Sequence, residues 1–405
     1  MAVKNIVVLA FSGGLDTSYC VKYLKHDLNF EVHSVLVNTG GFSQEELKAV
    51  EDHAYKLGVA KHETVDVVDE FYEKAIKYLI FGNVLKNNTY PLSVSAERVF
   101  QAIAIAEYAQ KVNAQHIAHG STGAGNDQVR FDLVFNIMVP NAQIITPIRD
   151  QQLSRQAEID YLKAHGVEMN WEKAKYSINK GLWGTSVGGA ETLTSKEALP
   201  EQAYPSQLKK EEPVQVTLGF EKGEITSIDG ESVKPVDAII KLNEMGNAYA
   251  IGRDIHVGDT IIGIKGRVGF EAAAPLMLIK AHHLLEKHVL TKWQQHWKEQ
   301  LASWYGMMMH EGQYLDPVMR NIEKFIEDTQ ENVTGKVYVK LAPYHFQVTG
   351  IESEHDLMNS KFGHYGEMNS GWTGEDVKGF TKILANQTKI YYAVNKQTEV
   401  EADAT

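Results

Sequence analysis

The feature that most constrains the fold is a stretch near the start of the chain, residues 5–24, which reads NIVVLAFSGGLDTSYCVKYL. Ile6–Phe11 is a short apolar run rich in β-branched residues, which predicts a buried strand. Gly13 and Gly14 follow this run, and a segment with helical spacing of apolar residues begins at Leu15. The sequence therefore predicts a strand, a glycine turn and a helix in direct succession.

This turn has the chemistry of an anion site. Glycine permits positive φ and the close approach of a ligand, and successive N–H groups at a helix N-terminus attract phosphate. Ser12, Thr17 and Ser18 add hydroxyl donors, although the string is neither a Walker A motif nor Gly-x-Gly-x-x-Gly. Asp16 suits the positive end of the helix dipole, with a metal ion or a ribose as alternative partners. A tight turn without a ligand is the plain alternative, and the length of the string favours phosphate.

Composition narrows the class of protein. The chain has 405 residues, of which 43% are hydrophobic and 23% are charged, as expected for a globular protein of two domains. The net charge of −12 argues against a general nucleic-acid or membrane-surface binder. The single cysteine, Cys20, is expected to be a buried structural thiol, and it indicates a reduced, cytoplasmic setting. We expect neither a signal peptide nor a membrane helix.

Strands alternate with helices over the first 165 residues, which predicts βαβ units and a parallel sheet. Ligands of such sheets bind beyond the carboxyl ends of the strands. Four stretches are expected to meet there: the glycine turn, the end of a second strand near Val37, and the loops Tyr90–Arg98 and His119–Arg130. Arg130 suits a carboxylate or phosphate, and Asp127 suits an ammonium group. The alternative is a solvated turn with a surface arginine.

The second half of the chain predicts an α+β domain, because its strands and helices are grouped. Asn170–Glu191 is rich in glycine and is expected to be a loop, and Thr260–Gly263 is expected to be a strand. Gly374–Gln397 predicts one final helix with an apolar stripe, which packs on its own domain or on another subunit. Histidines in amphipathic helices are expected at ordinary helix-face positions rather than in a metal site: His282, His283, His288 and His296.

Taken together, the motifs resemble the argininosuccinate synthase family, within the N-type ATP pyrophosphatases. The matching pieces are Ala10–Ser18 (AFSGGLDTS), Tyr90 with Ser95, His119–Arg130, and Ser177 with Ser186. The resemblance is dense over the first 190 residues and thinner afterwards. It implies a parallel-sheet nucleotide-binding domain (1–168), an α+β synthetase domain (169–370), and a C-terminal oligomerisation helix with a tail (371–405).

The resemblance also implies a reaction. The family joins citrulline and aspartate: the ureido oxygen attacks the α-phosphorus of ATP, giving citrullyl-AMP and pyrophosphate, and the aspartate amine then displaces AMP. Mg²⁺, a cytoplasmic location and a homotetramer are implied as well, with neither nucleic acid nor membrane as a partner. Positioning and charge stabilisation are expected to supply the rate, so no residue is assigned as catalytic or as a metal ligand.

Carried over by position, the resemblance implies three sets of contacts. The ATP set is Ala10, Phe11, Ser12, Gly13, Gly14, Leu15, Asp16, Thr17, Ser18, Val37 and Gly120. The citrulline set is Tyr90, Ser95, Asn126, Arg130, Ser177 and Ser186. The aspartate set is Thr122, Asn126 and Asp127.

Two positions depart from the family pattern. The family's usual citrulline-contacting Glu falls at Gly258, and its usual Tyr falls at Phe270. The first change removes a carboxylate that pairs with the substrate's α-ammonium, and an unpaired buried charge costs several kcal/mol. Three explanations stay open: Glu271 or Asp259 replaces the contact, the register differs, or the substrate is not quite citrulline.

Other functions predict different features. A related adenylating ligase would act on another ureido or carbonyl acceptor. A tRNA-thiolating relative would show catalytic cysteines and a basic surface, and a glutamine-fed relative would begin with a cysteine glutaminase. A non-catalytic nucleotide-binding protein would bind ATP without producing AMP, and the set Asn126, Asp127 and Arg130 argues against it.

Overall fold

The structure is a computed structural model that describes residues 5–171, 175–359, 363, 365–367 and 371–400. The chain forms two compact units, one through His355 and one from Asp356 onward. The three-part division expected from the sequence stays a prediction. Within the part of the chain that is described, no helix combines the length and the apolar character needed to cross a membrane.

The first sheet is the parallel sheet that the sequence predicts. Its strands lie in the order β3-β2-β1-β4-β5, and every neighbouring pair is parallel. Their bounds are β1 Ile6–Ala10, β2 Glu31–Asn38, β3 Lys61–Asp66, β4 His116–Ala118 and β5 Gln143–Ile145. The strand order reverses between β1 and β4. That reversal makes the carboxyl edge of these two strands the place where a ligand is expected.

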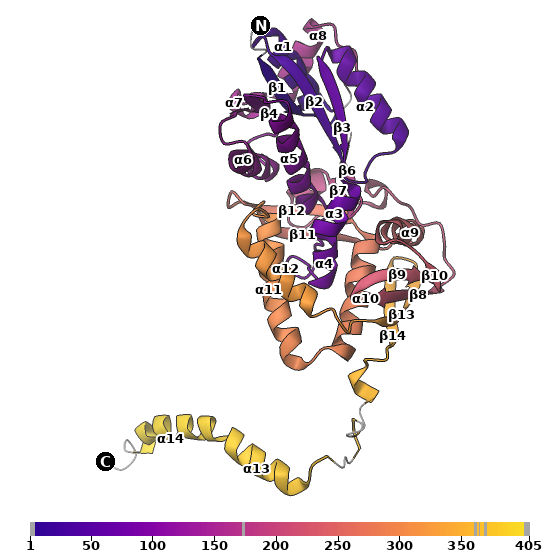
Figure 1. The fold of residues 1–405 in the computed structure, drawn as a ribbon, viewed down its shortest axis with the longest axis vertical. Helices are drawn as coiled ribbons and strands as arrows, with labels where there is room; N and C mark the ends of the chain where they lie inside the picture. The colour runs from indigo at the N-terminus through magenta and orange to yellow at the C-terminus, as the bar shows by residue number, and fades with distance from the viewer. Residues whose placement is uncertain (1–4, 172–174, 360–362, 364, 368–370, 401–405) are drawn as a thin grey trace. The chain divides into compact units, whose positions relative to one another are not determined.

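Helices cover both faces of this sheet (Figure 1). Alternate strand residues face opposite sides, so Val7 and Leu9 share a core with one set of helices and Val8 with the other. On the first face lie α1 Leu15–His26, α2 Gln44–Leu57, α7 Pro147–Asp150 and α8 Arg155–Ala164. On the second lie α5 Ser93–Lys111 and α6 Asp127–Met138. Cys20 is buried on α1, as predicted.

Helix α5 connects the two halves of the first unit. Thirteen of its nineteen residues are buried, because it packs on β1 and β2 and also on the second half of the chain. A second connection runs through α3 Val68–Phe71, the π-helical turn η1 Tyr72–Ile76 and α4 Lys77–Phe81, which Figure 1 shows reaching α10 and α12. These three segments form one continuous helical stretch that ends at Phe81, with the π-helical turn in its middle.

A four-stranded antiparallel sheet follows, in the order β11-β12-β7-β6. Its strands are β6 Ser177–Gly181, β7 Gly184–Gly188, β11 Arg253–Asp259 and β12 Lys265–Glu271. Two expectations are wrong here. The stretch expected to be a loop contains the hairpin β6–β7, since glycines serve close strand packing there, although residues 172–174 lie outside the described residues. The strand expected at Thr260–Gly263 is the turn between β11 and β12, where Gly263 has φ of +84°.

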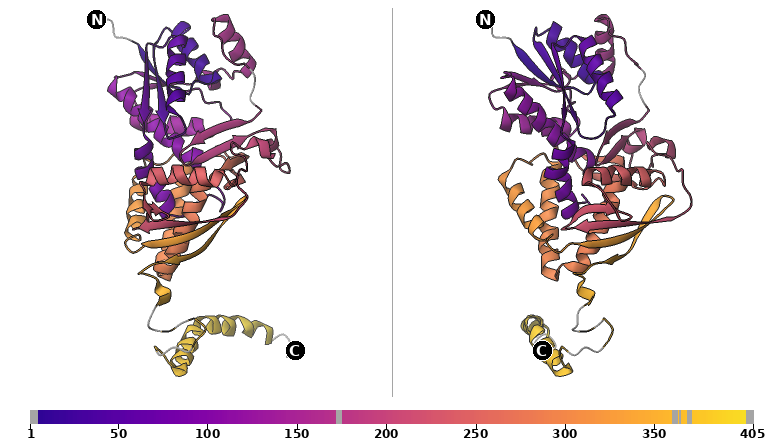
Figure 2. Two further views of the ribbon diagram at one scale, coloured as in Figure 1. Left: turned by 90° about the vertical axis from the view of Figure 1, so that its right-hand side faces the viewer. Right: turned by 45° about the vertical axis from the view of Figure 1, so that its right-hand side comes forward.

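The third sheet and its helices form the rest of the first unit, in agreement with the predicted α+β character. The sheet order is β10-β9-β8-β13-β14. Its strands are β8 Val214–Glu221, β9 Glu224–Ile228, β10 Glu231–Ser232, β13 Gly335–Ala342 and β14 His345–Glu352. The helices are α9 Pro235–Asn247, α10 Ala273–Val289, α11 Lys292–His310 and α12 Pro317–Asp328. Short 3₁₀ turns of this unit are η2 Ala190–Leu193 and η3 Glu201–Ala203, and η4 Leu357–Asn359 belongs to the second unit. Helix α10 packs on β13 and β14 (Figure 2).

Among its described residues, the second unit contains two α-helices, α13 Gly374–Leu384 and α14 Asn386–Val400. The prediction of one continuous helix over 374–397 is therefore wrong at one position, Ala385, where the helix is broken. The next residue is Asn386, and asparagine is a weak helix former because its side chain competes for backbone hydrogen bonds.

A buried ion pair joins α10 to α11. Lys298 Nζ lies 2.6 Å from Glu286 Oε2, and both side chains are 1% exposed. Lys298 also donates to the carbonyl of Phe81 at 2.5 Å. Glu286 accepts two further hydrogen bonds, from Asn83 and Gln330. The pair is therefore fully hydrogen-bonded, which is the condition under which a buried pair is tolerated.

Replacing Lys298 by Met leaves the Glu286 carboxylate buried without its cation. We expect Lys298→Met to lower the free energy of unfolding by about 3–5 kcal/mol, measured by chemical denaturation. Lys241→Met, which removes one partner of the exposed pair with Glu231, is the matched control and is expected to cost less than about 1 kcal/mol. Equal effects of the two changes would contradict a structural role for the buried pair.

Candidate functional site

The residues Ala10–Ser18 span the end of β1, the glycine turn and the first turn of α1. Gly13 has φ of +77°, in the left-handed region that favours glycine. Gly14 is the N-cap of α1 and supplies no side-chain cap, so the first backbone N–H groups of the helix are left for another partner. Ser12 and Gly14 are exposed. The turn is thus exposed at the carboxyl edge of the sheet, where the sequence predicts an anion site.

The hydroxyl groups of this turn have different environments. Ser18 is fully buried, donates to the carbonyl of Gly14 at 2.7 Å, and lies 2.9 Å from Nε2 of His53. Thr17 Oγ1 donates to the same carbonyl at 3.3 Å and lies 3.4 Å from Ser12 Oγ. Ser18 therefore fixes the shape of the turn, while Ser12 and Thr17 keep part of their surface toward solvent.

A second predicted stretch packs directly on this turn. Gly120 follows β4, and a Cβ placed on it would lie 3.4 Å from both Asp16 and Thr17 at the start of α1. A larger residue at 120 would push against the first turn of the helix. Behind it, His119 Nε2 lies 2.9 Å from Asp132 Oδ1, which holds the loop in place. The loop after β4 and the turn after β1 are therefore in contact at the point where the strand order reverses.

The end of β2 is organised by Asn38. Its side chain donates to Asp66 at 2.9 Å and accepts from the N–H of Gly40 at 3.0 Å. Val37, the predicted contact on this strand, is 4% exposed and belongs to the core. The backbone beyond it turns away from the sheet at Gly40, whose φ is +92°.

The hairpin β6–β7 packs on this turn. A Cβ on Gly41 would lie 2.3 Å from the carbonyl oxygen of Lys180, and one on Gly40 would lie 2.8 Å from the Cβ of Leu182. On its other side, Trp183 Nε1 donates to the carbonyl of Pro91 at 2.8 Å. The hairpin is therefore fixed between the end of β2 and the loop that contains Tyr90.

A charged cluster forms the next part of the site. The Asp127 carboxylate accepts from Arg130 at 2.8 Å and from Arg98 at 3.2 Å. Burial alone would raise the pKa of Asp127, but the two guanidinium groups outweigh it and hold that pKa below its usual value. Arg98 also donates to Asn179 Oδ1 of the hairpin at 3.3 Å. Asp127 is therefore an ionised carboxylate whose two arginines link α5, α6 and β6.

Two predicted residues on α5 and its preceding loop lie close to this cluster. Ser95 Oγ is 3.3 Å from His310 Nδ1, and Arg130 donates to the carbonyl of His310 at 2.9 Å. Tyr90 lies between two rings, with centroid distances of 5.1 Å to His256 and 5.5 Å to Phe270. Tyr90, Ser95 and Arg130 are all less than 5% exposed.

Two further predicted residues join the same region through the second half of the chain. Asn126 Oδ1 accepts from the N–H of Ile261 at 2.8 Å, so the turn between β11 and β12 is tied to the start of α6. Ser186 Oγ lies 3.4 Å from Asn179 Nδ2. Thr122 and Ser177 are exposed and take no part in these contacts. The structure thus brings most of the predicted acceptor residues together and leaves these two at its margin.

Comparison with known proteins agrees with this geometry. The family description "Arginosuccinate synthase N-terminal HUP domain" matches residues 6–168. The description "Arginosuccinate synthase C-terminal domain" matches residues 176–391. The chain belongs to the argininosuccinate synthase family.

Members of the family are similar to the chain over nearly its whole length. The argininosuccinate synthase of Methanocaldococcus jannaschii is 38% identical over 394 residues, covering 96% of this chain and 98% of the relative. That of Pyrococcus furiosus is 36% identical, covering 95% and 94%. That of Xanthomonas axonopodis pv. citri is also 36% identical, covering 96% and 95%. Both halves of the site therefore lie within the region shared with argininosuccinate synthases.

The carboxylates expected to replace the missing family Glu are engaged elsewhere. Glu271 lies 3.0 Å from Arg253 and accepts from Ser206 at 2.5 Å. Asp259 is exposed and lies 2.6 Å from Lys265. Both carboxylates thus already have a cationic partner, and their replacement of the family's Glu in this member of the argininosuccinate synthase family stays a prediction.

Sequence reasoning missed several residues of the site. Asn179 was detectable in principle, because it lies two residues from Ser177 on the same strand. Arg98 is the last residue of the predicted loop Tyr90–Arg98, yet its hydrogen bond to Asp127 depends on how α5 and α6 pack. His256 and His310 carry no local motif, since only the packing of β11 and α11 brings them to Tyr90 and Ser95.

A buried carboxylate lies at the base of the site. Glu97 is 3% exposed, and its Oε1 accepts from Arg98 at 3.1 Å and from Gln101 at 3.0 Å. Its Oε2 is buried without a hydrogen-bond partner in the described structure and lies 1.9 Å from where a Cβ on Gly181 would be. Burial raises the pKa of Glu97 to about 7 although Arg98 opposes the shift. Glu97 therefore packs α5 against the hairpin and exchanges a proton near neutral pH.

This raised pKa predicts a pH-dependent contribution to stability. The folded state retains the Glu97 proton that the unfolded chain loses above about pH 4.3. The contribution of Glu97 is therefore fully present below that value and is lost as the pH rises through about 7. We therefore compare the free energy of unfolding of Glu97→Gln with that of the parent, measured by denaturation at each pH. The difference should change in favour of the variant by about 2–3 kcal/mol from pH 5 to pH 8. A constant difference across this range would contradict the raised pKa.

Proposed function

We propose that the chain ligates L-citrulline and L-aspartate to argininosuccinate, converting ATP to AMP and pyrophosphate, a step of arginine biosynthesis. The observation that carries the proposal is the contact between the glycine turn after β1 and Gly120 after β4, on the loop that leads to Asp127 and its charged cluster. An anion site and an amino-acid site are thus adjacent at one sheet edge. The family membership and the names of the relatives support the same reaction.

In this proposal the nucleotide occupies the turn. The phosphates are held by the N–H groups at the start of α1, with Ser12 and Thr17 as hydroxyl donors. The remaining contacts are the other residues of Ala10–Ser18, together with Val37 and Gly120. Magnesium enters with the nucleotide as MgATP, and among the described residues no group of three or more His, Cys, Asp or Glu side chains could hold a metal ion.

The acceptor and the amine donor occupy the cluster next to it. Citrulline is assigned to Tyr90, Ser95, Asn126, Arg130, Ser177 and Ser186, and aspartate to Thr122, Asn126 and Asp127. Arg130 suits the carboxylate of an amino acid, because its guanidinium group presents several donors in one plane. The packing of the hairpin on β2 supports the inclusion of Ser186, since it brings the hairpin to the edge where the nucleotide is proposed to bind.

The chemistry follows from this adjacency. The ureido oxygen attacks the α-phosphorus of ATP, the bond to the β-phosphate oxygen breaks, and pyrophosphate leaves. The aspartate amine then attacks the ureido carbon of citrullyl-AMP, and AMP leaves with the former ureido oxygen. A ureido oxygen is a weak nucleophile, so holding it in line with phosphorus supplies much of the rate. Backbone N–H groups at the start of α1 stabilise the negative charge that develops on the phosphates.

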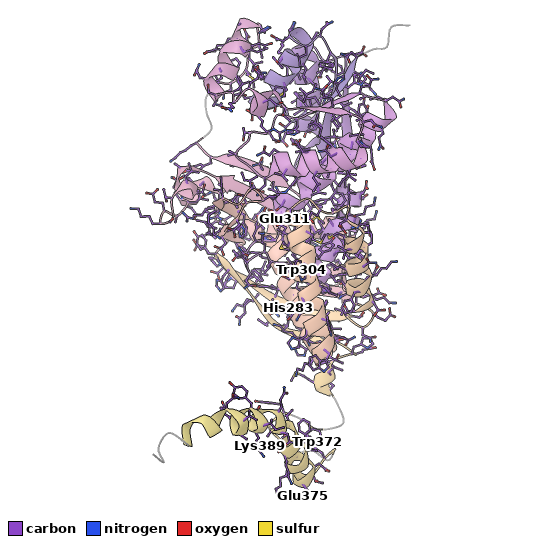
Figure 3. All side chains as sticks on the ribbon, turned by 90° about the vertical axis from the view of Figure 1, so that its left-hand side faces the viewer. His283, Trp304, Glu311, Trp372, Glu375 and Lys389 are labelled. Atoms are coloured by element: carbon purple, nitrogen blue, oxygen red, sulfur yellow. The ribbon has the colours of Figure 1, made fainter. Side chains whose placement is uncertain are left out.

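We also propose a cytoplasmic homotetramer. Its support is a set of exposed apolar residues on α13 and α14, each at least 62% exposed: Phe380, Ile383, Leu384, Ile390, Tyr391 and Val394. Tryptophans on α11 are exposed as well, among them Trp304, labelled in Figure 3. Surfaces of this kind mark contacts between proteins. The cytoplasm is consistent with the single cysteine, Cys20, being a buried free thiol.

The experiment that tests the function measures pyrophosphate release from MgATP. The four mixtures contain citrulline, aspartate, both or neither, and AMP and argininosuccinate are quantified in each. We expect strong release only when both amino acids are present, with one AMP and one argininosuccinate for each pyrophosphate. ATP binding without release in any mixture would refute the ligation of free citrulline and favour a different carbonyl acceptor or a non-catalytic nucleotide-binding protein.

A further inference from the structure

The end of β11 beside Tyr90 has an unusual composition for a site that receives a free amino acid. Gly258 lies there, paired with Gly266 across the hairpin, and its neighbour on the same strand face is His256. A Cβ on Gly258 would lie 2.6 Å from Nε2 of His256. The imidazole of His256 therefore occupies the space that a side chain at 258 would need.

His256 is buried against the proposed acceptor site. It is 6% exposed, and its ring stacks on Tyr90 at a centroid distance of 5.1 Å. Its Nδ1 is buried and has no hydrogen-bond partner in the described structure. Burial, followed by the nearby Lys86 ammonium, lowers the pKa of His256, so the ring is neutral at pH 7. A buried polar atom without a partner points to a group that the structure lacks.

A second buried imidazole lies in the same region. His310 is 6% exposed, and its Nδ1 faces Arg130 at 3.4 Å and Ser95 at 3.3 Å. Arg130 can only donate, so Nδ1 accepts and the proton resides on Nε2. That Nε2 makes no hydrogen bond of normal geometry in the described structure, although the backbone of Asp259 lies close enough to the ring to favour its charged form. His310 therefore presents a donor, and a ligand here needs an acceptor as well as a donor.

Three carboxylates of this region have cationic partners, while Glu97 at the base of the site keeps one oxygen without a hydrogen-bond partner in the described structure. Asp127 accepts from two arginines, Glu271 pairs with Arg253, and Asp259 pairs with Lys265. The cations that act on His310 are Arg130 and Lys86. An ammonium group placed beside His256 would thus meet a neutral ring and a nearby cation in a buried setting, which is unfavourable.

We propose that the acceptor binds with an uncharged α-nitrogen, as an Nα-acylated citrulline, and that the N–H of its amide donates to His256. This inference rests on the proposed ligation and specifies its substrate class. An amide carries one N–H donor and one carbonyl acceptor, whereas an ammonium group only donates. The amide N–H suits Nδ1 of His256, and the amide carbonyl suits the N–H at Nε2 of His310. The ureido chemistry is unchanged, and the product is Nα-acylated argininosuccinate.

The test compares two acceptors on the full chain. Pyrophosphate release is measured with MgATP, aspartate, and either citrulline or Nα-acetylcitrulline, and kcat/KM is determined for each. We expect kcat/KM to be at least about tenfold higher for Nα-acetylcitrulline than for citrulline, because one additional hydrogen bond corresponds to about that ratio. Equal use of both, or a preference for citrulline, would overturn the inference and leave the ligation intact. If neither acceptor supports pyrophosphate release, the ligation and the inference are overturned together.

A variant tests whether this end of β11 sets the preference. Gly258→Glu combined with His256→Ala supplies a carboxylate and frees the space that the imidazole occupies. We expect the double variant to shift the kcat/KM ratio toward citrulline by about tenfold or more. His256→Ala alone is the matched control: it should lower kcat/KM for Nα-acetylcitrulline and leave kcat/KM for citrulline unchanged, so that only the double variant raises kcat/KM for citrulline. An unchanged ratio in an active double variant would refute the role of this position.

Discussion

One carboxylate holds together the parts of the site that are far apart in the sequence. Asp127 accepts from Arg98 of α5 and Arg130 of α6. Through these arginines it is linked to Asn179 of the hairpin and to His310 at the end of α11. A buried guanidinium group without a partner costs several kcal/mol. The hairpin and α11 therefore have one favourable arrangement relative to the sheet. That arrangement positions the residues proposed to bind the acceptor.

The nucleotide side depends on the parallel sheet. Strand order reverses between β1 and β4, and the segments that follow these two strands are in contact through Gly120 and the first turn of α1. The hairpin extends this edge, because Gly40 and Gly41 allow it to pack directly on the end of β2. The backbone proposed to bind phosphate and the side chains proposed to bind the two amino acids thus lie along one edge. This adjacency is what an attack of a carbonyl oxygen on a phosphorus requires.

The sequence predicted the parts that depend on local pattern. The strand, glycine turn and helix around Gly13 follow from an apolar run and the conformational freedom of glycine, and the parallel sheet follows from alternating strands and helices. The hairpin β6–β7 was not predictable from composition, because its glycines serve strand packing rather than disorder. Thr260–Gly263 is apolar enough for a strand, yet Gly263 makes it a turn. His256 and His310 reach the site only through tertiary packing, so no local signal marks them.

The central claim is that this edge brings the oxygen of the acceptor to the α-phosphorus of ATP. The most direct measurement uses an acceptor labelled with ¹⁸O in its ureido group, turned over with MgATP and aspartate. Mass spectrometry of the products then locates the label. The account predicts one ¹⁸O atom in each AMP and none in pyrophosphate, because the oxygen that attacks phosphorus leaves with AMP. Unlabelled AMP formed together with the ligated product would contradict adenylation of the acceptor.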